Sequence, residues 1–500
     1  MTPNVEIHDV VIVGAGISGI NAAYRMQSQL PGCQYTILEA RHTLGGTWDL
    51  FKYPGIRSDS DLHTFGFQWM PWTENRPIAD GESIKRYMDD CTKHFGIDKK
   101  IQYKHKVLSG DWDSKEQAWV LELEVNGTEK KQVRGRFIIL GTGYYDYNEP
   151  LPATIPGLQN FKGTIVHPQF WPSDLDYTDK KVVVIGSGAT AITLLPSLAD
   201  KAKQVIQLQR SPSYILSLPN NAKQGWLTSF LPRWMQLRVE RVRNLVFPFL
   251  FFRFCRAFPN AARNLIRLGT TKQLPKNIPH DPHFEPTYNP WEQRMCLCPD
   301  GDFYAALKKG NAEIVTDTIQ NIHDHGIDLG SGNKIEDVDI IVTATGLKIQ
   351  LAGGATWSVD GVPVNIPSKF LWRSVMLQDT PNLAFVIGYT NASWTPGADA
   401  TAQLVARLLK DMNKAGQTSA VPRLDDSAAE MKSAPVLNLN STYIKSAMDK
   451  LPKTGDKGPW VRRDNYFSDI WIAKHGDLKT GLEFVSNDRA GMNGHAKKTQ

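Results

Sequence analysis

Two glycine-rich turns of the same kind constrain this chain more than any other feature. The first, Gly14-Ala15-Gly16-Ile17-Ser18-Gly19, follows the apolar run 9–13 and precedes a helical pattern that continues to about residue 28. The second, GSGATA at 186–191, follows the apolar run 181–185 and precedes a helical pattern to about residue 199. A β-branched run, a glycine turn and a helix in this order are typical of a dinucleotide-binding unit. The chain therefore predicts an α/β fold with two Rossmann-like dinucleotide-binding domains.

The first unit has the full set of residues that a dinucleotide requires. Gly14 permits the tight turn, Gly16 lets a pyrophosphate approach the backbone, and Gly19 lets helix and strand pack closely. The second strand, 35–38, ends at Glu39, whose carboxylate can accept bonds from ribose hydroxyls. An acid at this place suits the AMP half of FAD.

The second unit differs where its second strand, 205–209, ends. Arg210 and Ser211 stand where the first unit has Glu39, and a guanidinium with a hydroxyl suits a 2′-phosphate. NADP is therefore favoured over NAD. Two dinucleotide sites in one chain predict FAD in one and NADPH in the other, with hydride transfer between them as the default chemistry.

Composition excludes several other classes of protein. Lys plus Arg number 57 and Asp plus Glu 51 in 500 residues, without a long basic run, so we expect no nucleic-acid partner. The five cysteines are scattered and form no CxxC pair, so we expect no disulfide framework and no metal site. A reducing cytoplasm fits this usage best, and residues 1–10 carry no signal-peptide pattern.

The run 245–254 (LVFPFLFFRF) is the most membrane-like stretch of the chain. It contains Pro248 and Arg253 and is too short to span a bilayer. A helix lying peripherally on a membrane is one reading, but we favour a helix buried in the protein. The surrounding segment is helical, basic and aromatic, which predicts a helical insertion that forms a lid or wall of the substrate site.

These patterns predict the following domain organisation. Residues 1–150 form the first segment of an FAD-binding domain, and 349–486 its second segment. Residues 151–348 form an NADP-binding domain, including a linker at 161–172 and the helical insertion at about 217–290. The polar tail 487–500 is expected to be disordered. The linker FKGTIVHPQFWP reads as an irregular connector, because its apolar residues follow neither a helical nor a strand period.

The cysteine positions argue against a flavin-dependent disulfide reductase. A disulfide reductase needs a redox cysteine pair soon after the first glycine turn, and no pair lies between Cys33 and Cys91. Cys296 and Cys298 are far away and have the wrong spacing. Thiol chemistry is therefore not expected.

Two further motifs are specific enough to indicate a family. GGTWDLFKYPGIRSD at 45–59 and FKGTIVHPQFWP at 161–172 resemble the fingerprints of the type I Baeyer–Villiger monooxygenases. The matching positions are Gly45, Gly46, Trp48, Tyr53, Pro54, Gly55 and Asp59 in the first motif, and Phe161, Gly163, His167, Trp171 and Pro172 in the second. Trp-Pro separates this group from the flavin-containing and N-hydroxylating monooxygenases. Further stretches, such as IGSGATA, YNPWEQR and GYTNASWT, are similar to the ethionamide-activating branch.

The resemblance implies a role for individual residues. FAD contacts fall on Ser18, Glu39, Thr47, Trp48, Asp49, Leu50, Asp59 and the backbone of Val107. NADPH contacts fall on Arg57, Ser58, Gly186, Ser187, Gly188, Ala189, Thr190, Ala191, Ile192, Arg210 and Ser211. Arg294 takes the position of the family's active-site arginine, and Asp59 would orient it. His167 is expected to fix the domain geometry at a hinge formed by the linker.

The implied reaction converts ketones to esters or lactones with NADPH and O₂ through a flavin C4a-peroxide, with sulfides as secondary substrates. Two alternatives stay open: a flavin-dependent S- or N-oxygenase without ester formation, and a non-catalytic flavoprotein that senses NADPH. The aromatic run 65–72 and Trp394 belong either to the substrate pocket or to the core. Pro396-Gly397 replaces the Leu-Lys common in this branch, so substrate preference does not transfer.

Overall fold

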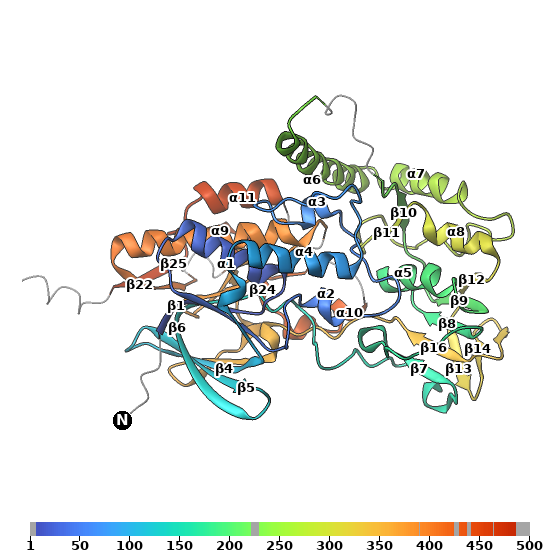
Figure 1. Cartoon of the computed structure of the whole chain (residues 1–500), viewed down its shortest axis with the longest axis horizontal. Coiled ribbons are helices and arrows are strands. Elements are labelled where there is room, and N and C mark those ends of the chain that lie inside the picture. Colours follow the sequence, from blue (N-terminus) through green and yellow to red (C-terminus); the bar gives the residue numbers. More distant parts are fainter. Residues whose placement is uncertain are drawn as a thin grey trace, which may run out of the picture.

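Two sheets, the first mixed and the second parallel, carry the two glycine-rich turns. The computed structural model describes residues 7–221, 230–389, 391–424, 430–437, 442–463 and 465–486. The predicted disordered tail, 487–500, lies outside these ranges. Figure 1 shows the two halves side by side, with β1 and α1, which flank the first glycine turn, on the left and β8 and α5, which flank the second, on the right.

The first sheet is built around β1 (Ile7–Val13). Val10, Val11 and Ile12 are fully buried, as expected of a central strand covered on both faces. β1 pairs in parallel with β2 (Tyr35–Glu39) on one side and with β6 (Glu129–Leu140) on the other. The remaining strands are β3 (Ile101–Tyr103), β4 (His105–Asp113), β5 (Ala118–Val125), β17 (Thr356–Val359), β18 (Val362–Pro363), β19 (Leu371–Trp372), β20 (Met376–Leu377) and β21 (Leu383–Phe385).

Helices cover one side of this sheet. α1 (Ile17–Gln29) follows the first glycine turn and packs against α9 (Trp394–Ala415). Arg25 on α1 and Asp399 on α9 form a two-bonded ion pair, with N to O distances of 2.7 and 2.9 Å. Segments far apart in the sequence thus complete one domain. The other helices of this half are α2 (Thr47–Leu50), α3 (Leu62–Phe65), α4 (Gly81–His94), α10 (Thr442–Lys445) and α11 (Tyr466–His475).

The second sheet has the parallel order β12, β9, β8, β16, β7. Its strands are β12 (Ala312–Thr316), β9 (Gln204–Gln209), β8 (Lys181–Ile185), β16 (Ile340–Thr343) and β7 (Thr164–Val166). α5 (Ala189–Leu198) follows the second glycine turn, and α8 (Asp302–Lys309) packs beside it. The predicted pair of Rossmann-like domains is therefore confirmed.

Short sheets complete the fold. They are formed by β10 (Ile215–Leu218) with β11 (Cys296–Pro299), β13 (Ile319–His323) with β14 (Gly326–Leu329) and β15 (Lys334–Ile335), β22 (Gln417–Pro422) with β25 (Leu482–Ser486), and β23 (Ala434–Pro435) with β24 (Lys453–Thr454).

The linker is more regular than its sequence indicates. The interpretation of 161–172 as an irregular connector is wrong for residues 164–166, which form β7 and pair with β16, whereas 161–163 and 171–172 are irregular as expected. The run is short and its first two strand residues are exposed, since β7 is an edge strand. A single 3₁₀ turn, Pro168–Phe170, follows it.

The chain crosses between the two halves twice, and the crossings lie side by side. Asp146 N–H donates to Lys348 O at 2.7 Å, and Gln350 N–H donates to Tyr144 O at 3.0 Å. Among the described residues, the strands of the first sheet come from 7–140 and 356–385, and those of the second from 164–343. We propose on this basis the domain limits expected from the sequence.

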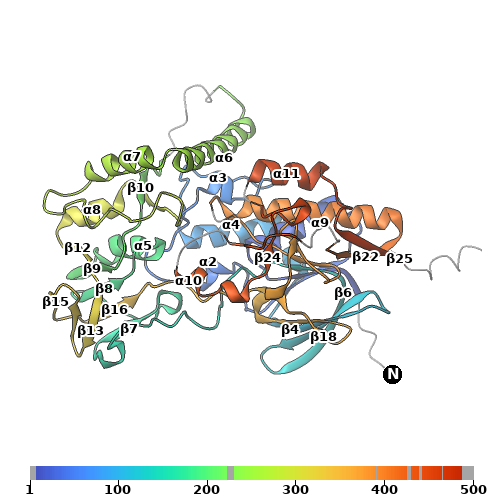
Figure 2. The same cartoon turned by 180° about the vertical axis from the view of Figure 1, so that it is seen from behind.

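The helical insertion lies between β10 and β11. It contains α6 (Arg233–Ala257) and α7 (Pro259–Thr271), which Figure 2 shows along one edge of the molecule. Our expectation of a buried helix at 245–254 is wrong, because Phe247 is 66% exposed and Leu250 57% exposed. Among the described residues, no helix has both the length and the apolar character to cross a membrane.

Candidate active site

The first glycine turn has the geometry of a pyrophosphate cradle. Gly14 has a φ of +100°, and a Cβ added to Gly19 would lie 1.9 Å from the Gly14 carbonyl oxygen. A Cβ on Gly16 would meet only the Cα of Gly46, at 3.7 Å. The outer glycines are therefore required by packing, whereas Gly16 leaves room beside the start of α1 for a ligand.

Glu39 lies at the end of β2, directly beside this turn. Its side chain accepts bonds from the N–H of Ala15 at 2.6 Å and from the N–H of Arg41 at 2.9 Å. Burial raises the pKa of its carboxyl above the ordinary value, although these two N–H groups oppose the shift. The carboxylate is thus held in one place, where the sequence predicts a ribose.

The segment 45–59 begins at the first turn. Thr47 Oγ1 bonds to the hydroxyl of Tyr145, and Trp48 packs edge-on against Phe65 with ring centres 5.5 Å apart. Leu50, at the end of α2, is partly buried. Asp49 is buried in an ion-pair cluster with Lys85 and Arg41. Burial raises the pKa of Asp49, but the hydrogen bond from Lys85 and the charge of Arg41 lower it overall.

The same segment then reaches the second half of the molecule. Tyr53 is only 7% exposed and lies in the hydrophobic core around β8 and α5. A Cβ on Gly55 would meet Ser197 Oγ of α5 at 2.0 Å, so the loop lies directly on this helix. Arg57 forms an ion pair with Asp302 at the start of α8. Ser58 is buried, and its hydroxyl donates to Ser60 O at 2.7 Å.

Asp59 and Arg294 meet where the two halves adjoin. Arg294 donates from Nη2 to Asp59 Oδ1 at 2.9 Å, and its Nε lies 2.9 Å from Asp59 Oδ2 in the same ion pair. The arginine side chain is 39% exposed and the aspartate 28% exposed, and both line the same cavity. Residues 235 positions apart in the sequence are thus held in one planar, two-bonded pair.

The second glycine turn resembles the first. A Cβ on Gly186 would meet Ala344 O at 2.3 Å, whereas a Cβ on Gly188 would meet nothing within 4 Å. Ala191 and Ile192 are buried under the turn, while Ala189 is exposed and Thr190 partly exposed. Ser187 Oγ donates to Ser211 O at 2.6 Å. The exposed Arg210 forms no salt bridge with any residue that the structure describes, so its guanidinium is available to an anion.

A cavity of about 640 Å³ opens beside the Asp59–Arg294 pair. Its wall is largely aromatic and aliphatic, from α6, α7, β10 and β11, and the start of α9 contributes Ser393 and Pro396. Ser393 Oγ is buried and has no hydrogen-bond partner among the described residues. Apolar walls with a few convergent polar groups are typical of a small-molecule site.

Trp394 and the aromatic run 65–72 are placed by the structure outside the wall of this cavity. Trp394 stacks on Tyr144 and donates from Nε1 to Ser18 Oγ at 2.8 Å, so it adjoins the first glycine turn. Trp69 stacks on Tyr24 and Phe67 in the core. The contact of Trp394 with Ser18 at the first glycine turn was not predicted from the sequence. The start of helix α9 at Trp394 is the feature that could have indicated it.

Val107 and the linker residues have clear structural positions. Val107 is buried in β4 opposite Leu123. In the linker, Phe161 fills the core behind the second sheet, and a Cβ on Gly163 would meet Asp339 O at 2.4 Å. His167 Nδ1 accepts from Gln169 N–H at 3.2 Å, and burial lowers the pKa of its imidazole. Trp171 packs edge-on against Tyr177 at 6.3 Å. The cofactor and hinge roles of these residues stay predictions.

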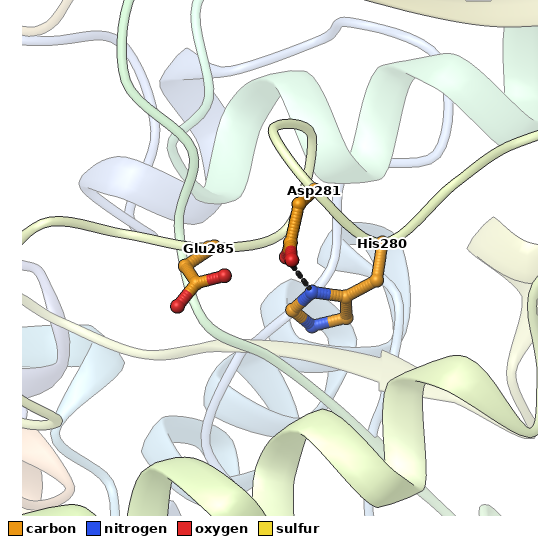
Figure 3. Close-up of side chains that lie close together, drawn as sticks. All are labelled: His280, Asp281 and Glu285. Atoms are coloured by element: carbon orange, nitrogen blue, oxygen red, sulfur yellow. Dashed lines mark hydrogen bonds and ion pairs between the residues drawn. The ribbon is translucent and has the colours of Figure 1, made fainter.

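The described residues hold one cluster of potential metal ligands: His280, Asp281 and Glu285, shown in Figure 3. Arg267 donates to both carboxylates, at 2.6 Å to Asp281 and 2.7 Å to Glu285. His280 bonds to Asp281 at 2.5 Å. Arg267 thus occupies oxygens of both carboxylates, and the cluster supports no metal assignment.

Comparison with known proteins identifies the family. A model of the flavin-binding monooxygenase-like family matches residues 7–445. The chain belongs to this family. The FAD-containing monooxygenase EthA of Mycobacterium tuberculosis (strain H37Rv) is 43% identical over 480 residues, which cover 95% of this chain and 97% of that protein. The chain is thus a flavin monooxygenase, in agreement with the fingerprints at 45–59 and 161–172.

Solved structures of other monooxygenases share the fold of this flavin monooxygenase. An oxidized steroid monooxygenase bound to NADP matches with a TM-score of 0.75 at 21% identity, over 96% of this chain and all of that one. Cyclohexanone monooxygenase in its cyclohexanone-bound form matches with a TM-score of 0.72 at 19% identity, over 96% and 100% of the two chains.

Proposed function

We propose that this flavin monooxygenase binds FAD and NADPH and uses O₂ to convert ketones to esters or lactones. The observation that carries the proposal is the Asp59–Arg294 pair, which faces an apolar cavity where the two dinucleotide-binding halves adjoin. A cation held beside a largely apolar wall suits this chemistry, because it can stabilise negative charge that develops on oxygen.

The first half fits FAD. Gly16 leaves space at the start of α1, and Glu39 is fixed beside it for a ribose. The start of α9 lies close by, because Trp394 bonds to Ser18. The unpartnered hydroxyl of Ser393 at this helix start lines the cavity and would be available to hold a bound flavin. Bound FAD supplies hydride acceptance and the activation of O₂.

The second half fits NADPH. Gly188 leaves its side of the turn open, and the exposed Arg210 follows the adjacent strand β9. A guanidinium there pairs with a 2′-phosphate through charge-assisted bonds, which NADH cannot make. The loop 53–59 touches α5 and would hold the nicotinamide-binding half against the flavin-binding half.

Arg294 would act on the negative charge that develops on oxygen during the reaction. The contacts of Nη2 and Nε with Asp59 orient the guanidinium group of Arg294. Asp59 is thus a positioning residue, and the apolar wall of the cavity would exclude water and strengthen the electrostatic effect of the arginine.

Cavity chemistry favours apolar substrates with one polarised group. Phe249, Phe251 and Phe252 line the wall from α6, and Met295 and Leu297 line it from the other side. Such a site binds a hydrophobic ketone through its carbon skeleton and leaves the carbonyl at the polar end. A thioether of similar shape fits equally, so sulfoxidation is expected as a side activity.

Product analysis tests the proposal. The purified full-length protein is given NADPH, O₂ and either an aliphatic ketone or a thioether, and the products are identified by mass spectrometry with ¹⁸O₂. Incorporation of one labelled oxygen into an ester supports the proposal. Sulfoxide without ester across a ketone panel would refute it in favour of an S-oxygenase, and no substrate-dependent oxygen uptake would favour an NADPH sensor.

A further inference from the structure

An exposed apolar surface extends across α6, α7 and α11. Large hydrophobic side chains on these helices point into solvent instead of the core, and α6 contains the apolar run 245–252 among its arginines. The exposed members are Trp234, Val239, Val242, Phe247 and Leu250 on α6, Phe258 beside it, Leu265 and Leu268 on α7, and Phe467 and Trp471 on α11. We name this set the apolar edge.

The apolar edge is one continuous surface. α6 and α11 touch through Phe249 and Phe467, whose ring centres lie 5.6 Å apart. α6 and α7 pack against each other, and both figures show the three helices along the same edge of the molecule. A surface of this kind on a globular protein marks an interaction site.

Packing within the protein does not account for the composition of α6. Of its 25 residues only Gln236 and Cys255 are buried among those that the structure describes. A helix with apolar residues on all sides is normally enclosed by other elements. Here the enclosing partner must be something other than the described part of this chain.

The positive charge of α6 and α7 indicates that the partner is negatively charged. The span 233–271 holds eight arginines and one acidic residue, Glu240, whereas the rest of the chain holds 49 basic and 50 acidic residues. Arg238, Arg243, Arg253 and Arg256 are exposed and form no salt bridge with a described residue. The positive charge of the whole chain is therefore concentrated on the helices that expose apolar side chains.

We propose that the apolar edge docks on a lipid bilayer with anionic headgroups. Apolar side chains interspersed with arginines are what an interfacial helix presents to such a surface, because the rings and aliphatic chains enter the acyl boundary while the guanidinium groups meet phosphates. A second copy of this chain is less suitable, since a symmetric contact would bring the same arginines together.

The docked orientation gives the cavity access to the bilayer. Phe247 and Leu265 are exposed members of the apolar edge and also line the cavity beside Arg294. The cavity therefore opens on the face that we place against the lipid. Docking itself does not depend on the proposed ketone oxidation, and it can be tested without turnover.

Vesicle co-sedimentation tests the docking. The full-length protein with its FAD is mixed with vesicles of phosphatidylcholine alone or with phosphatidylglycerol added. We expect binding to the anionic vesicles, and about tenfold weaker binding for Arg253→Glu with Arg256→Glu, because each arginine contributes to attraction at such a surface. Val242→Ser with Leu250→Ser should weaken binding similarly. These side chains do not line the cavity, so thioether oxidation by both variants serves as a check of folding.

Matched changes elsewhere serve as controls. Lys130→Glu with Lys131→Glu reverses the same charge on β6, and Val362→Ser removes an exposed apolar side chain on β18, which Figure 2 shows at the opposite edge. Both should bind vesicles as the unchanged protein does. Equal binding by all variants, or no binding to anionic vesicles, would overturn the proposal. So would a dimer in sedimentation velocity that the Val242 and Leu250 changes dissociate, because that result would assign the edge to a second copy.

Discussion

Replacing Arg294 by alanine removes the one described cation that bonds to Asp59 at the cavity. The change leaves the two glycine turns, Glu39 and Arg210 untouched. We therefore expect FAD binding and flavin reduction by NADPH to stay within about twofold of the unchanged protein, and oxygen transfer to the ketone to fall.

The size of the fall follows from the geometry. A unit charge about 4 Å from a developing negative charge contributes about 4 kcal/mol at an effective dielectric constant of about 20. The Arg294 side chain is 39% exposed, so solvent screens part of this effect. We take about 2–3 kcal/mol as the remainder, which corresponds to about a 100-fold loss of kcat for ester formation.

The assay separates the two halves of the reaction. Anaerobic stopped-flow spectroscopy measures flavin reduction, and gas chromatography measures ester formation. Arg25→Ala is the matched control, because Arg25 and Asp399 form a pair with the same two-bonded geometry away from the cavity. Its loss leaves the buried Asp399 without its cation, which lowers Tm and leaves kcat nearly unchanged. An Arg294→Ala enzyme that forms ester at an unchanged rate would show that the pair only joins the domains.

Three further experiments test the cofactor assignments and the exclusion of thiol chemistry. Arg210→Ala should raise the KM for NADPH about tenfold or more and leave that for NADH unchanged, since only NADPH has the 2′-phosphate; equal effects in steady-state kinetics would refute the assignment. Gly188→Ala should leave Tm unchanged and weaken NADPH binding, because the added Cβ enters the open space beside the turn. Gly19→Ala should instead lower Tm, because its Cβ would lie 1.9 Å from the Gly14 carbonyl oxygen. Iodoacetamide at pH 8 should leave activity unchanged, because burial raises the pKa of the Cys296 and Cys298 thiols to about 12 and keeps them protonated.

The two glycine turns could be predicted from the sequence because their physics is local. Gly14 has a φ of +100°, which favours glycine, and a Cβ on Gly19 would meet the Gly14 carbonyl oxygen, so both requirements arise within one strand, turn and helix. The further contact of a Gly14 Cβ with Gly141 O, at 2.8 Å, is not local. The pairing of Asp59 with Arg294 is not local, and only the family resemblance brought these residues together in advance. Residues 164–166 were missed as a strand because an edge strand has no alternating apolar pattern to detect.

The exposure of α6 could not be predicted for a different physical reason. The sequence of an apolar helix has the same pattern whether protein or lipid covers the helix, because both environments shield apolar side chains from water. The run 245–254 was therefore assigned to the interior, where such helices are usually found. Only the arrangement of α3, α7 and α11 around it shows how little of its surface the protein covers.

The loop 53–59 joins the two halves with contacts of unequal strength, and this bears on how they move. Tyr53 is buried in the second core and is anchored by apolar contacts. Arg57–Asp302 and Asp59–Arg294 are partly exposed ion pairs, each worth about 1 kcal/mol or less in such surroundings. A shift of the second half would therefore break the ion pairs while Tyr53 holds. Because Asp59 orients Arg294, any such shift would also turn this guanidinium, so under the proposed role of Arg294 the position of the NADPH-binding half would determine when the cation is aligned for oxygen transfer.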